Sequence, residues 1–115
     1  MPDLGVHLTL TCEWEEYIWG AYDSSLDGIL TDSRGALPRT AGEHLNITTE
    51  PEGRSAVVQE LRAQIDGAMD RFGDITHLDS HMFVLLYPPN ADIYMNLALE
   101  YRLPCMLPGT ADAWR

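Results

Sequence analysis

The segment from Ser55 to Phe72 constrains the fold most strongly, because its apolar residues recur with the period of an α-helix. They stand three and four residues apart with charged residues between them, at Val58, Leu61, Ile65, Ala68, Met69 and Phe72. Such a helix has to bury its apolar stripe against another element. Ser55 is expected to cap its start, and Gly73 stands where the end of a helix favours a left-handed residue.

Extended segments are expected on both sides of this helix. Residues 4–11 alternate apolar side chains with His7, Thr9 and Thr11, a period of two that is typical of a strand. Residues 74–79 are extended again, residues 90–101 form a second helix capped by Asn90, and residues 104–107 form a last short strand. This order predicts an α/β fold, in which parallel strands carry helices on the outside.

Residues 12–54 lack a sustained period and contain the turn signals WG, DG, RG and EP. We expect a long excursion there, with at most a short helical turn or hairpin. It carries several aromatic residues, Trp14 and Trp19 among them, which either bind a substrate or simply cover the core. His44 lies in this segment between acidic and amide residues, so we expect a histidine on a surface loop.

The composition limits the possible partners. Eighteen acidic and 7 basic side chains give a formal net charge of -11, which disfavours nucleic acid and anionic lipid surfaces. No apolar run approaches the length of a membrane span, and no export signal is recognised at the N-terminus. Cys12 and Cys105 are expected to be reduced, buried thiols. We therefore expect a single domain in the cytoplasm.

Two histidine-containing segments carry the candidate chemistry. In the sequence THLDSHM at 76–82, His77, Asp79 and His81 share one face if the segment is extended. His7 lies on the first expected strand and could point into the same interior. Imidazole is a common metal ligand, and a carboxylate can ligate or orient it. The pattern fits either an open metal site or a hydrogen-bonded polar strand end.

The segments GVHLTLT (5–11), EWEEYIWG (13–20) and THLDSHM (76–82) together resemble the YdjC-like family of carbohydrate deacetylases. The segments ELRAQID and LALEYRLPCMLP are similar to that family as well. The resemblance implies a (β/α) barrel-like fold that removes acetyl groups from N-acetylated sugars with a divalent metal, either Mg²⁺ or Zn²⁺. It also implies that His7 and His81 bind the metal, while His77 and Asp79 support the site.

The family's acidic NADDFG-like motif, which supplies another metal ligand and a general base, has no match in this sequence. We therefore expect a partial barrel, from a fragment or a shortened homologue, with impaired activity. An incomplete barrel exposes strand edges, so we also expect a homo-oligomer. The alternative is a non-catalytic domain that binds an ion or a sugar through the aromatic excursion.

Overall fold

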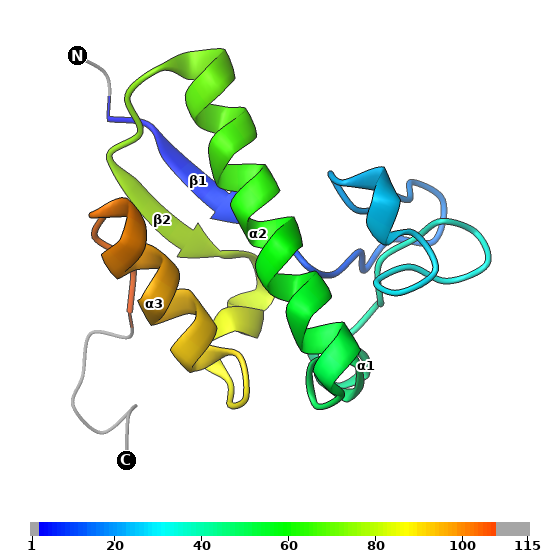
Figure 1. Ribbon diagram of the computed structural model, residues 1–115. Coiled ribbons are helices and arrows are strands. Elements are labelled where there is room, and N and C mark those ends of the chain that lie inside the picture. The colour runs from blue at the N-terminus through cyan, green and yellow to red at the C-terminus, as the bar shows by residue number, and fades with distance from the viewer. Residues whose placement is uncertain (1–2, 108–115) are drawn as a thin grey trace.

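The computed structural model describes residues 3–107 of the chain. In chain order its elements are strand β1 (Gly5–Leu8), the 3₁₀ helix η1 (Ser24–Leu26), helices α1 (Ala41–Thr48) and α2 (Pro51–Phe72), strand β2 (His77–Ser80), the 3₁₀ segment η2 (His81–Leu86) and helix α3 (Ala91–Tyr101). Both long helices lie on the same side of the two strands (Figure 1).

Strands β1 and β2 pair in parallel. Gly5 lies opposite His77, and His7 lies opposite Asp79. Leu8 and Leu78 are fully buried in the apolar core beneath the helices, so the histidine-bearing face is the opposite one. Cys105 adds a single parallel bridge beside Leu78 in place of the expected third strand. The α/β class is confirmed, whereas the barrel-like completion of the sheet stays a prediction.

Helix α2 begins one turn earlier than its apolar period indicates. Glu50 is its N-cap residue and Pro51 occupies the first helical position. The N–H group at that position has no partner within a helix, so a proline, which lacks this group, loses no hydrogen bond there. The expectation of a cap at Ser55 is therefore wrong, whereas Gly73 does end the helix with a positive φ of 80°. Phe72, expected on the buried stripe, is 61% exposed because it lies in the last turn, beyond the core.

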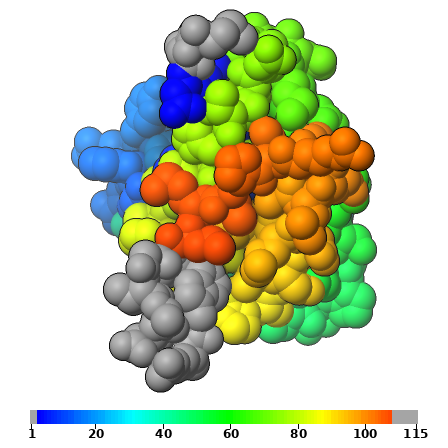
Figure 2. Space-filling view, turned by 90° about the vertical axis from the view of Figure 1, so that its left-hand side faces the viewer, coloured from blue at the N-terminus to red at the C-terminus, as the bar shows by residue number. Residues whose placement is uncertain are grey.

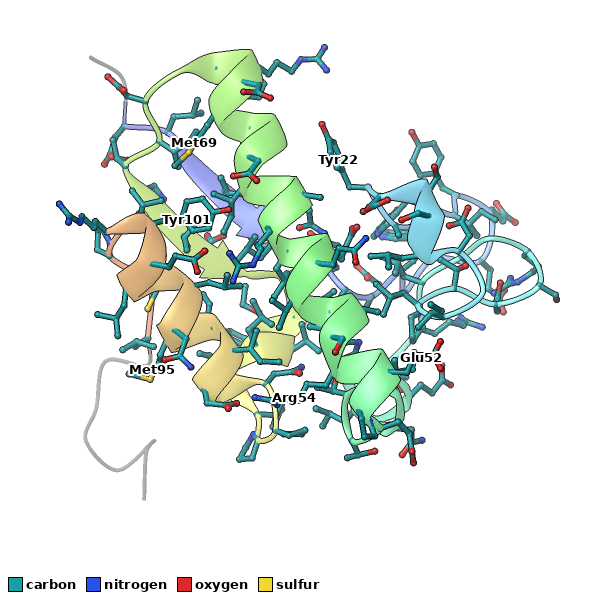
Figure 3. The ribbon with its side chains drawn as sticks, viewed as in Figure 1. Tyr22, Glu52, Arg54, Met69, Met95 and Tyr101 are labelled. Carbon is teal, nitrogen blue, oxygen red and sulfur yellow. The ribbon has the colours of Figure 1, made fainter. Side chains whose placement is uncertain are left out.

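Helix α3 begins after Asn90, as expected, and buries Ile93 and Leu97. The side chain of Asn90 does not cap the helix; its amide donates to the carbonyl of Val84 at 3.1 Å. Figure 3 shows Arg54 and Tyr101 at the two ends of the contact between α2 and α3. Tyr101 donates to Asp66 on α2 at 2.7 Å, and Arg54 pairs with the first turn of α3.

The excursion contains more regular secondary structure than a single helical turn or hairpin. The 3₁₀ helix η1 and helix α1 lie within residues 12–54, and α2 begins there. Leucines rather than aromatic residues join it to the core: Leu26, Leu30 and Leu37 are at most 4% exposed. Of its aromatic side chains, Trp14, Tyr17 and Tyr22 are exposed, and Trp19 packs partly against the core.

His44 is buried, which corrects the expectation of a surface loop histidine. It lies on α1 with only 1% of its surface exposed, and its Nε2 is 2.9 Å from the hydroxyl of Thr48 one turn later. Burial lowers the pKa of His44 to about 4, because an apolar environment disfavours the imidazolium. Its hydrophilic neighbours in the sequence point elsewhere on the helix, so local composition misrepresents its environment.

Both cysteines are free thiols; Cys12 is buried, and Cys105 is partly so. Burial raises the pKa of the Cys105 thiol. Among the helices of residues 3–107, none combines the length and the apolar character needed to span a membrane.

Candidate metal centre

The pairing of the two strands brings His7 and Asp79 together. The two residues are direct partners in the parallel register, with both side chains on the face away from the helices. The Nδ1 atom of His7 lies 2.6 Å from Oδ1 of Asp79. The His7 side chain is 56% exposed.

His81 approaches from the segment that follows β2. It is the first residue of η2, and its Nδ1 atom lies 3.2 Å from Nε2 of His7. The two imidazole rings meet edge to face, with 5.2 Å between their centroids. Two histidines that are 74 positions apart in the sequence therefore face each other directly.

Glu13, which the sequence motifs did not single out as a site residue, completes this group. Its Oε2 atom lies 2.8 Å from Nε2 of His81. That hydrogen bond lowers the pKa of the Glu13 carboxyl, so the group is a carboxylate at neutral pH. Glu13 follows Cys12 at the start of the excursion, and its approach depends on how the chain turns after β1. The available signal was its place within the EWEEYIWG segment, next to the polar face of the strand.

The two carboxylates determine the tautomers of the two rings. Asp79 accepts a hydrogen bond from Nδ1 of His7, and Glu13 accepts one from Nε2 of His81. The remaining nitrogens, Nε2 of His7 and Nδ1 of His81, then carry lone pairs that face each other at 3.2 Å. Two lone pairs at this distance repel unless a proton or a cation lies between them.

The distance between these two nitrogens is close to the separation of two imidazole ligands on one zinc ion. Zinc binds imidazole nitrogen at about 2.0–2.1 Å, so two nitrogens of a tetrahedral site are separated by roughly 3.3 Å. In many metal sites the other ring nitrogen is held by a carboxylate, as Asp79 and Glu13 do here. Within residues 3–107, however, no group of three or more His, Cys, Asp or Glu side chains is arranged to hold an ion. The described residues thus present two facing imidazole nitrogens, with a carboxylate at the other nitrogen of each ring.

His77 shares the face of Asp79, but it lies at the other end of the short strand. Its Nδ1 atom is 3.0 Å from the hydroxyl of Thr76 and 3.8 Å from a carboxylate oxygen of Asp3. Its ring covers Gly5, where a Cβ atom would stand 2.2 Å from Nε2 of His77. The structure therefore brings Asp79 into the cluster, whereas His77 packs on the backbone of β1.

Trp19 and Trp14 occupy different environments. The ring of Trp19 lies edge-on to His81, with 6.1 Å between centroids, and its Nε1 donates to the carbonyl of Thr11 at 2.9 Å. Trp14 is 60% exposed beside the same stretch of chain. Trp19 thus borders the candidate site, and substrate binding by either tryptophan stays a prediction.

Helix α2 holds the end of β1 in place. The side-chain amide of Gln64 accepts from the N–H of Thr9 at 3.0 Å and donates to the carbonyl of the same residue at 2.8 Å. Glu60, fully buried, accepts from Gln64 and from the backbone N–H groups of Tyr22 and Asp23. Figure 3 shows the side chain of Tyr22 directed towards α2. One helix face therefore fixes both the strand that carries His7 and the excursion that follows Glu13.

Known proteins with similar sequences identify the family. The model of the YdjC-like protein family matches residues 1–115. A carbohydrate deacetylase of Thermus thermophilus is 37% identical over 110 residues, which cover 96% of this chain and 39% of that protein. A carbohydrate deacetylase of Brevibacillus brevis is 36% identical over 105 residues, covering 91% of this chain and 38% of that protein. The chain thus spans about two-fifths of these relatives, and it belongs to the YdjC-like protein family.

Proposed function

We propose that this chain carries part of the site of a metal-dependent carbohydrate deacetylase that acts on N-acetylated sugars. Membership of the family and the names of the relatives support the reaction class. The observation that carries the proposal is the pair of imidazole nitrogens, on His7 and His81, that face each other at 3.2 Å. Nitrogen ligands favour Zn²⁺ over Mg²⁺, which prefers oxygen.

The role of each side chain follows from its contacts. His7 and His81 would hold the ion, and Asp79 and Glu13 would fix the tautomer and orientation of the two rings. A divalent ion in such a site supplies polarisation of the acetyl carbonyl and a lower pKa for bound water. With two ligands among residues 3–107, we expect weaker metal affinity and slower turnover than a site with three protein ligands would give.

The test combines metal binding with catalysis. Titration calorimetry with Zn²⁺ and with Mg²⁺ should show one site that is lost in His7→Ala and in His81→Ala. His77→Ala is the matched control, since it removes a histidine from the same strand face without touching the two facing nitrogens. Metal-dependent release of acetate from N-acetylglucosamine oligomers would support the deacetylase. Unchanged zinc affinity in both cluster variants would contradict the metal assignment.

A non-catalytic domain that binds a sugar or an ion is the second candidate. The exposed aromatic side chains of the excursion, Trp14, Tyr17 and Tyr22, favour it because they offer a surface to an amphipathic ligand. Binding of N-acetylglucosamine oligomers that is lost in Trp14→Ala, without release of acetate at any metal concentration, would favour this second candidate.

A further inference from the structure

Residues 13–18 form a loop whose two ends are fixed to the same stretch of chain. The N–H of Cys12 donates to the carbonyl of Pro38 at 2.8 Å, and the N–H of Leu37 donates to the carbonyl of Trp19 at 3.1 Å. Figure 2 shows the blue start of the excursion at the surface, beside the yellow-green and yellow segment of β2 and η2. Both ends of the loop are therefore held, although most of its side chains are exposed.

Two contacts of Trp19 close the loop from one end to the other. Its indole Nε1 donates to the carbonyl of Thr11 at 2.9 Å, and its backbone N–H donates to Sγ of Cys12 at 3.4 Å. Thr11 is fully buried and Cys12 is 1% exposed, so the acceptors of both contacts are shielded from water. Shielding strengthens a hydrogen bond, because water competes less for its partners. Trp19 therefore restricts the path of the chain directly after Cys12.

The first residue of this loop, Glu13, is the one that contacts the candidate metal centre. Its Oε2 atom accepts from Nε2 of His81 at 2.8 Å, and the two side chains are 29% and 19% exposed. Glu15, two residues later, pairs with Arg39 instead, at 3.1 Å. The path of the loop thus decides which of these two carboxylates reaches His81.

We propose that Trp19 is a positioning residue for the candidate metal centre: by closing the loop, it holds Glu13 against Nε2 of His81 and keeps the lone pair of Nδ1 free. The inference rests on the proposed function, because it assigns that lone pair to the metal. In this role Trp19 acts without contact to the metal or the substrate. Its ring also lies edge-on to His81, with 6.1 Å between centroids, so a direct effect of the ring has to be separated from the effect through Glu13.

The carboxylate matters because a neutral His81 has two places for its proton. At Nδ1 the proton would form a hydrogen bond to Nε2 of His7, 3.2 Å away, and would remove the repulsion between the two lone pairs. That tautomer would fill the space between the rings with a proton and leave His81 without a lone pair directed at His7. Glu13 opposes it, since a hydrogen bond to a carboxylate is stronger than one between neutral groups.

The tautomer of His81 in metal-free protein is the first readout. Long-range ¹H–¹⁵N spectra at one neutral pH compare wild type with Trp19→Phe, which keeps an aromatic ring but lacks the indole N–H. We expect the ratio of the Nδ1 to the Nε2 tautomer to rise on the order of tenfold, as loss of one shielded hydrogen bond allows. Tyr17→Phe is the matched control, because it removes a polar group from a ring in the same loop that is 77% exposed. Unchanged signals of the buried His44 show that the fold is kept.

A double-mutant cycle separates the two routes from Trp19 to His81. Glu13→Ala alone should move the proton of His81 towards Nδ1 at least as far as Trp19→Phe does. In the Glu13→Ala background, Trp19→Phe should then add nothing, since its effect passes through Glu13. A second shift of equal size would show that the ring acts on His81 directly, and it would overturn the proposal. If Trp19→Phe fails to fold, benzothienylalanine at position 19 makes the same test, because it keeps the volume of the indole and lacks its N–H.

Zinc binding separates this proposal from the deacetylase assignment. Titration calorimetry should show the affinity for Zn²⁺ falling on the order of tenfold in Trp19→Phe, in step with the tautomer, and unchanged in Tyr17→Phe. A tautomer shift in a protein that neither binds zinc nor releases acetate supports the hold of Trp19 on Glu13 and contradicts the proposed activity. Zinc binding and acetate release that are the same in Trp19→Phe, with His81 still protonated at Nε2, overturn the positioning role and leave the proposed activity standing.

Discussion

Acidification should destabilise this protein through His44. The imidazole is 1% exposed, and burial lowers its pKa to about 4, whereas histidine in an unfolded chain titrates near about 6.5. The unfolded state therefore binds more protons between these two pKa values. The contribution of His44 to the free energy of unfolding is fully present above the pKa of the unfolded state, and it is lost as the pH drops towards the pKa of the folded state. The difference amounts to about 3 kcal/mol over the whole window, at about 1.4 kcal/mol per unit of pKa.

Urea unfolding followed by tryptophan fluorescence measures this loss. Between about pH 7 and about pH 5 we expect His44 to account for about 2 kcal/mol of the fall in the free energy of unfolding. Staying above pH 5 also avoids the isoelectric point near 4.4. His44→Gln is the matched control, because a glutamine can still contact Thr48 but does not titrate. If wild type and variant lose the same free energy of unfolding over this range, the claim that His44 is buried and neutral in the folded protein is refuted.

Three further predictions concern stability and assembly. Gly5→Ala should destabilise the fold, because its Cβ would clash with the ring of His77; a double-mutant cycle with His77→Ala should recover about 1 kcal/mol, and additive effects would contradict the contact. Glu60→Gln should cost about 2 kcal/mol of unfolding free energy and speed amide hydrogen exchange at Tyr22 and Asp23. Unchanged exchange at those amides would contradict the role of the Glu60 carboxylate in holding them. The short sheet and its exposed apolar neighbours should cause self-association, and a monodisperse monomer in light scattering at micromolar concentration would contradict this.

The approach of His7 to Asp79 could be anticipated from the sequence. Both residues lie at alternating positions of segments expected to be extended, and parallel pairing puts equivalent faces together. His81 could be anticipated less directly, since it leaves the strand and enters η2, yet its ring still faces His7. Local period thus predicts which face a strand residue occupies, and it predicts less about the residue after the strand ends.

Two of the features that the sequence did not predict depend on contacts that local patterns do not encode. Glu13 reaches His81 only because the excursion is held by α2, through hydrogen bonds that span 37 and 38 residues. His44 is buried on a helix of eight residues, too short to show a clear apolar period. The start of α2 did have a local signal. The pair Glu50–Pro51 was interpreted as a turn, although a proline is equally typical of the first position of a helix.

The tautomers of the histidines test the central claim most directly. Long-range ¹H–¹⁵N correlation spectra of the metal-free protein at neutral pH should show His7 protonated at Nδ1 and His81 protonated at Nε2, as their carboxylate partners require. Adding Zn²⁺ should then shift Nε2 of His7 and Nδ1 of His81, while the signals of His44 and His77 stay in place. Opposite tautomers, or zinc shifts at His44 or His77 instead, would contradict a metal centre built on the two facing nitrogens.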